Sequence, residues 1–179
     1  FRMDRIYSQM GYAFAKHIFG IKGSYAVDPQ KGAVVMTLTT QGDAPIHYTL
    51  DGSEPTAASP RYTGPVEIGK SARFRATALR EGGENASYSR EFAFSKSTGR
   101  PAVLNTKPND SYTFEGASLL VDGYHSRPVF TSGAWLGYLD EPLDVTIDMG
   151  GEQSYRSVEL ETLAEKGDWI FPPSSVTVW

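Results

Sequence analysis

Short apolar–polar alternations, separated by glycine and proline, constrain this chain more than any other feature of its sequence. In runs such as 33–40 and 72–80, apolar side chains recur at every second position, which is the spacing of a strand with one buried face. Turn sequences such as Asp28-Pro29-Gln30-Lys31-Gly32 separate these runs. The predicted strands are 24–27, 33–40, 46–50, 62–68, 72–80 and 87–95. With no helical pattern between them, they predict a β-sandwich close to the immunoglobulin or fibronectin type III plan.

The same alternation predicts a hydrophobic core. In the run 72–80, Phe74, Ala76 and Ala78 are expected to face inward, and Thr77 is expected to face outward. The core aromatics predicted across the sandwich are Tyr48, Phe74, Phe92 and Phe94. Burial of each is worth about 1.5–3 kcal/mol, which is an adequate core for a domain of this size.

Before the strands, residues 1–9 carry apolar side chains at helical spacing, and Gly11 ends that pattern. A single short amphipathic helix is not stable by itself in water, so its apolar side needs a partner. Either it packs on the following β region, or it closes a domain that precedes it.

Composition excludes several classes of function. The net charge is −4 and the basic residues are scattered, so no basic face for nucleic acid is predicted. No apolar run approaches the roughly 20 residues of a membrane span. The absence of cysteine removes disulfides, thiol nucleophiles and thiolate metal sites.

The run IHYTLDGSEPTAASPRY at 46–62 is the most specific motif. Read from its residues alone, it is a strand that ends at Asp51-Gly52, followed by a polar loop, and it carries no chemistry. YTLDGSEPT, followed by Ser59, Tyr62 and Pro65, resembles the chitobiase/β-hexosaminidase C-terminal domain. That domain is a small β-sandwich behind the catalytic barrel of many family 20 glycoside hydrolases. The resemblance implies that residues 1–22 are a trailing helix and connector from such a barrel, and that residues 23–97 are the sandwich.

The second half of the chain has a different sequence pattern. LLVDG at 119–123, GAWLGYLDEPLDVTIDMG at 133–150 and GDWIFPPSSVTV at 167–178 resemble the N-terminal part of a discoidin, or factor 5/8 type C, domain. This is a jelly roll shared with family 32 carbohydrate-binding modules. The interpretation is a linker at 98–104 and a partial discoidin-like domain at 105–179. Strands are expected at 119–121, 143–149, 158–163 and 175–179, fewer than the eight or so of a jelly roll. The domain is therefore truncated, or its open edge is covered by something else.

Catalytic chemistry is not predicted in this chain. Family 20 enzymes use a sequential Asp-Glu pair in the barrel, and the pair present here, Asp140-Glu141, precedes a predicted strand of the discoidin-like part. We interpret it as a solvated loop. His17, His47 and His125 lie in three different elements without metal-binding spacing.

The resemblance does suggest binding residues. In discoidin-like modules the aspartate of the turn at Asp122-Gly123 often holds a structural calcium ion, although an ordinary Asp-Gly turn fits the residues equally well. Tyr124, His125 and Arg127 have the side-chain types that bind sugars, and Trp169 is a further aromatic candidate. Packing is the competing interpretation of both Trp135 and Trp169-Ile170-Phe171.

Together these expectations describe a non-catalytic accessory C-terminal region of an exported (periplasmic, cell-surface or secreted) chitobiase-like β-N-acetylhexosaminidase. It would brace the catalytic barrel of the same chain and contribute to binding N-acetylhexosamine- or galactose-type glycans. It would need no cofactor, apart from the structural calcium ion that the resemblance suggests. The alternative is a structural spacer or adhesion segment without a ligand. A small hydrolase in its own right is disfavoured, because no nucleophile or carboxylate constellation is present.

Overall fold

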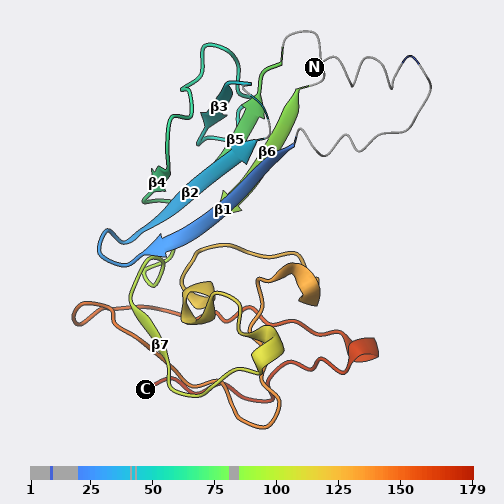
Figure 1. The fold of residues 1–179 in the computed structure, drawn as a ribbon. Coiled ribbons are helices and arrows are strands. Elements are labelled where there is room, and N and C mark those ends of the chain that lie inside the picture. Colours follow the sequence, from blue (N-terminus) through green and yellow to red (C-terminus); the bar gives the residue numbers. More distant parts are fainter. Residues whose placement is uncertain (1–8, 10–19, 41, 43, 81–84) are drawn as a thin grey trace. The chain divides into compact units, whose positions relative to one another are not determined.

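The computed structural model describes residue 9 and residues 20–40, 42, 44–80 and 85–179. These residues are mainly β, which confirms the predicted fold class (Figure 1). The helix predicted at 1–9 lies outside the described residues apart from Gln9, which is helical. In the described part of the chain, no helix is long and apolar enough to cross a membrane.

The first six strands form two three-stranded sheets, as in a β-sandwich. One sheet has the order β1-β2-β4 and the other has the order β3-β5-β6. All six predicted runs contain a strand, so these predictions are confirmed. The bounds are β1 Ile21–Asp28, β2 Ala33–Thr40, β3 Ile46–Thr49, β4 Val66–Ile68, β5 Ala72–Ala78 and β6 Ala86–Phe92.

The β1–β2 hairpin turns where the sequence predicts it. The Asp28 carboxylate accepts hydrogen bonds from the backbone N–H groups of Gln30, at 3.1 Å, and Lys31, at 3.3 Å. Gly32 takes a positive φ of 61°, which only glycine adopts without strain. In Figure 1 the arrows of β1 and β2 run antiparallel on either side of this turn.

The chain divides into two compact units whose boundary runs through the strands. The first contains residues 20–25 together with Met36–Val66 and Arg73–Arg90. The second contains Ala26–Val35, Glu67–Ala72 and Glu91–Trp179. The predicted domain limits at 22/23, 97/98 and 104/105 stay predictions.

Phe74 of β5 is the centre of the first unit's core. It is fully buried, as are Met36 of β2 and Ala78 of β5. The Tyr48 ring stacks on Phe74 with centroids 5.7 Å apart, and the Tyr88 ring meets it edge-on at 6.4 Å. The alternation of Phe74, Ala76 and Ala78 is thus confirmed.

Thr77 was predicted to face solvent, and this is wrong. Thr77 is buried, and its hydroxyl donates a 3.4 Å hydrogen bond to the Glu54 carboxylate of the loop that follows β3. The period-2 pattern assigns Thr77 correctly to the face opposite Phe74, but a polar loop folds over that face.

In the second unit, the segment 95–100 is an ordered turn. The backbone N–H of Ser95 donates to the Thr98 hydroxyl at 2.9 Å, and the N–H of Gly99 donates to the Val121 carbonyl at 2.8 Å. Thr98 is buried. The linker predicted at 98–104 is therefore partly a turn and partly a strand, because β7 occupies Ala102–Leu104.

Strand β7 pairs antiparallel with β8, Val145–Ile147, in the register Val103↔Thr146. This confirms the strand predicted at 143–149. The strand predicted at 119–121 is wrong, since Gly116–Leu120 forms a 3₁₀ helix. The segments 158–163 and 175–179 contain no strand either. A strand exists only where another backbone pairs with its N–H and C=O groups, and none of the described residues pairs with these two segments in a sheet.

Candidate functional site

The loop that follows β3 holds the most specific sequence motif, and its polar groups are bonded to one another. Asp51 accepts hydrogen bonds from the N–H of Ser53, at 2.9 Å, and from the Ser53 hydroxyl, at 2.6 Å. The Thr49 hydroxyl donates to the Ser53 carbonyl at 2.6 Å. Gly52 has a φ of 84°, as the Asp-Gly turn prediction requires. The motif is therefore a self-bonded turn.

Two contacts hold this loop against β5. Glu54 forms an ion pair with Arg75, and the Arg75 guanidinium also donates to the Gly52 carbonyl at 3.3 Å. Both partners of the pair are partly exposed, so the pair itself contributes little to stability. Its effect is to position Glu54 over Thr77.

The other end of the loop is held by β2 and β3. His47 Nδ1 lies 2.7 Å from the Ser59 carbonyl oxygen. Because a carbonyl only accepts, the proton is on Nδ1. The N–H of Leu38 donates to the Tyr62 hydroxyl at 3.0 Å, which ties the returning chain to β2. His47 and Tyr62 thus have structural roles.

Asp51 should make the stability of this unit depend on pH. Hydrogen bonds from the Ser53 hydroxyl and N–H hold the pKa of Asp51 below its ordinary value. A carboxyl group with a lowered pKa in the folded state stabilises that state above its unfolded pKa. The contribution is lost as the pH falls through the folded pKa. We expect Asp51→Asn to be less stable than the wild type at neutral pH, and the difference to vanish in strong acid.

Urea unfolding of both proteins between pH 7 and pH 2 measures this difference. Asp110→Asn is a control on an exposed carboxylate in the other unit, whose ion pair with Lys107 is itself highly exposed and contributes little to stability. A stability gap for Asp51→Asn that stays constant down to pH 2 would contradict the role of the Asp51 charge.

Asp122 is in a turn that pairs with the end of β6. Its carboxylate is buried and accepts a 2.8 Å hydrogen bond from the N–H of Tyr124. Phe92 and Tyr124 form an antiparallel bridge, and the N–H of Ala93 donates to the Gly123 carbonyl at 2.7 Å. The described residues hold no group of three or more His, Asp or Glu side chains that could bind a metal ion. Asp122 therefore has an observed structural role, and the calcium ion stays a prediction.

The three predicted sugar-binding residues after this turn have different environments. Tyr124 is half-buried, and its ring packs on Phe92 with centroids 6.3 Å apart. His125 is exposed, with Nδ1 3.3 Å from a carboxylate oxygen of Glu161. Arg127 is exposed, and its carbonyl accepts a 3.2 Å hydrogen bond from the Trp135 indole. Tyr124 packs within the fold, whereas the His125 and Arg127 side chains are exposed.

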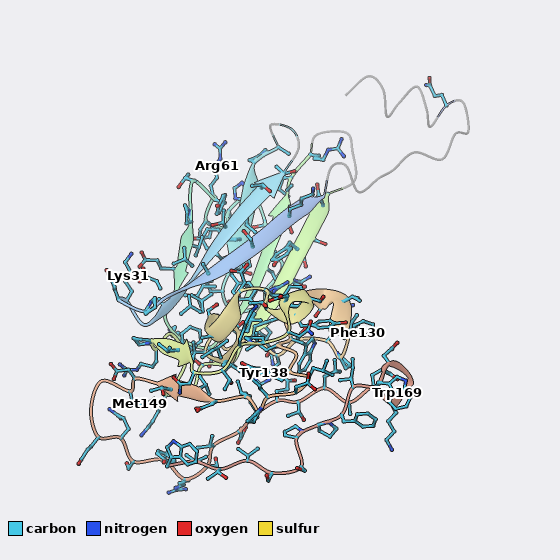
Figure 2. All side chains as sticks on the ribbon, turned by 60° about the horizontal axis from the view of Figure 1, so that its bottom comes forward. Lys31, Arg61, Phe130, Tyr138, Met149 and Trp169 are labelled. Atoms are coloured by element: carbon cyan, nitrogen blue, oxygen red, sulfur yellow. The ribbon has the colours of Figure 1, made fainter. Side chains whose placement is uncertain are left out.

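The Trp169 side chain is largely exposed, at 84%. It follows the 3₁₀ turn Lys166–Asp168 in a tight loop closed by two 3.0 Å backbone hydrogen bonds between Glu165 and Ile170. Figure 2 shows Trp169 on this loop. Its φ is +59°, which is disfavoured for any residue with a side chain. In this structure the Trp169 side chain is thus mostly exposed, and both interpretations of it stay predictions.

Phe171 was not among the predicted binding residues. It is 60% exposed, and its ring meets Trp169 edge-on with centroids 6.5 Å apart. No sequence signal pointed to Phe171, because Trp169 lies in a left-handed turn and the i, i+2 rule of extended strands does not apply there. His125 and Trp169 have different observed partners, Glu161 and Phe171.

The Asp140-Glu141 pair and the histidines lie apart from one another in the described residues. Asp140 and Glu141 are exposed in an irregular segment before β8, as expected of a solvated loop. His47 donates to a carbonyl and His125 lies beside Glu161, while His17 is outside the described residues. Within the described ranges these groups form no nucleophile–base pair.

The fold and its contacts define a β-sandwich module whose distinctive motif forms a loop bonded to itself and to β5. Residues 24–90 match the family model of the Chitobiase/beta-hexosaminidase C-terminal domain. This range contains the motif at 46–62, so the sequence-based resemblance is confirmed for the sandwich. It indicates an accessory domain of a glycoside hydrolase. No curated protein matches the chain.

Proposed function

We propose that this chain is the non-catalytic accessory C-terminal region of a chitobiase-like β-N-acetylhexosaminidase. The observation that carries the proposal is the match of residues 24–90 to a domain named for those enzymes. The internally bonded motif supports it, because Asp51 and Glu54 are engaged in holding a loop. Bond cleavage would belong to a barrel in the same polypeptide, which this region braces.

Two further parts of the proposal concern residues 91–179, which lie outside the match. We assign them to a discoidin-like module that binds N-acetylhexosamine- or galactose-type glycans, with His125, Arg127 and Trp169 exposed for contact. A calcium ion at Asp122 would require backbone carbonyls as additional ligands, since the carboxylate is the hard oxygen donor that the turn offers. Export of the parent enzyme (periplasmic, cell-surface or secreted) is part of the same proposal and rests on the family match.

A hydrolysis assay tests the non-catalytic assignment. We expect the chain to release no chromophore from a chromogenic N-acetylglucosaminide above the buffer rate, because Asp140 and Glu141 are exposed in an irregular segment and Asp51 and Glu54 hold a loop. A matched assay of Asp140→Asn and Glu141→Gln checks the Asp-Glu pair directly. Turnover by the wild type that either substitution abolishes would contradict the proposal.

The structural spacer is a second candidate. It is favoured by one observation, namely that the specific motif is accounted for by contacts within the fold. Glycan binding by the chain separates the two functions, since a spacer has no ligand.

A further inference from the structure

The start of β6 carries a motif that has no part in the proposed function. Asn85-Ala86-Ser87 has the Asn-x-Ser pattern, with x other than proline, of an acceptor for an asparagine-linked glycan. Asn109-Asp110-Ser111 is a second example of the same pattern. Because three-residue patterns of this kind also arise by chance, the surroundings of the two asparagines have to distinguish them.

The Asn85 and Ser87 side chains are exposed on the same face of an extended segment. Exposed and half-buried residues alternate without interruption from Asn85 to Glu91. This alternation has the period of a strand with one outer face, so the amide and the hydroxyl two residues later lie on the same side. Among the described residues, β6 is also an edge strand, at the end of the order β3-β5-β6 (Figure 1). A bulky group joined to Asn85 would therefore extend from the rim of its sheet into solvent.

The hydrogen bond that holds the Asn85 side chain uses an atom that glycosylation leaves in place. Oδ1 of Asn85 accepts a 3.1 Å hydrogen bond from the backbone N–H of Arg80, which ties the start of β6 to the chain just after β5. A glycan is joined to the other end of the amide, at Nδ2, and the carbonyl oxygen keeps its lone pairs. The contact with Arg80 is therefore compatible with the modified side chain.

Asn109 is exposed as well, but its motif is wound into a turn. Asn109 is the N-cap of the 3₁₀ helix Asp110–Tyr112, and its Oδ1 accepts a 3.0 Å hydrogen bond from the N–H of Ser111. The backbone of Asn109 donates to the Gly137 carbonyl at 2.8 Å and accepts from the Tyr112 N–H at 2.8 Å. The side chain is thus folded back on its own motif, and an enzyme that binds all three residues would have to open the turn first.

From these observations, and resting on the export part of the proposed function, we propose that Asn85 is an acceptor for an N-linked glycan. The donor is an oligosaccharide joined to a polyprenyl diphosphate. Nδ2 of Asn85 bonds to the anomeric carbon of the oligosaccharide and loses one proton. The bond from that carbon to the diphosphate oxygen breaks, and the polyprenyl diphosphate leaves with the electron pair. The Ser87 hydroxyl is the group by which the transferring enzyme recognises the motif.

The experiment is incubation of the full chain with a purified oligosaccharyltransferase and a dolichyl-diphosphate-linked oligosaccharide, followed by mass spectrometry of the intact protein. We expect a mass increase equal to the transferred oligosaccharide. Asn85→Gln and Ser87→Ala should each abolish it, whereas Ser87→Thr, which keeps a hydroxyl, should retain it. Ser87→Ala leaves the hydrogen bond between Asn85 and Arg80 intact, so a loss in this variant is separate from any disturbance of that bond.

Asn109→Gln is the matched control, and its mass increase should equal that of the wild type. The assignment would be overturned if the wild type gained no mass, or if the gain persisted in Asn85→Gln and disappeared in Asn109→Gln. Neither result would bear on export of the parent enzyme, because the purified transferase takes the place of the compartment. The hydrolysis assay decides the non-catalytic assignment separately.

Discussion

Replacing Phe74 with alanine is expected to lower the free energy of unfolding by about 3–5 kcal/mol, the usual cost of removing a fully buried phenylalanine. Phe74 has no exposed surface, and it contacts Tyr48 on one side and Tyr88 on another. Removing its ring takes away the free energy of burial and leaves a cavity. The rings of Tyr48 and Tyr88 are held by their own strands, so they cannot move far enough to fill it. A loss of this size is a large part of the stability of a small domain.

Urea unfolding followed by circular dichroism measures the effect. Phe171→Ala is the matched control, because the same side chain is removed from a position that is 60% exposed, and its change should stay within about 0.5 kcal/mol. If Phe74→Ala cost less than about 1 kcal/mol, Phe74 could not be the centre of the core.

The second large effect is expected at Gly99. Its φ is +76°, and a Cβ atom there would lie 2.5 Å from the carbonyl carbon and 2.8 Å from the Cα of Gly32. Both contacts are with backbone, so neither can be relieved by rotating a side chain. We expect Gly99→Ala to destabilise the protein by roughly 2–5 kcal/mol, the combined cost of a left-handed alanine and of overpacking.

Two other glycines separate these two contributions. Gly32 also has a positive φ, of +61°, but a Cβ there would meet no atom within 4 Å. Gly32→Ala should therefore cost only the conformational part, about 1–2 kcal/mol. Gly69 has neither constraint, and Gly69→Ala should stay within about 1 kcal/mol of the wild type. Equal losses in Gly99→Ala and Gly32→Ala would show that the close approach to Gly32 does not matter.

The candidate site was only partly accessible to sequence reasoning. Trp169 could be selected as an aromatic residue after a turn, with packing as the competing interpretation, but its exposure of 84% could not be read from the sequence. Tyr124 had the right side-chain type for sugar binding, yet its pairing with Phe92, more than thirty residues earlier, gives it a place in the fold. A ring's environment depends on distant segments, which a local motif does not encode.

The sequence by itself determined the strands of the sandwich and the turns between them. Alternation along 33–40 and 72–78 and the chemistry of Asp28–Gly32 and Asp51–Gly52 act between neighbouring residues, and the structure follows them. Only the tertiary structure decided that Thr77 is buried beneath Glu54 and that residues 158–163 stay without a paired strand. The physical reason is that backbone conformation and side-chain alternation are local properties. Burial and strand pairing require a second segment of chain, and folding alone brings that segment into place.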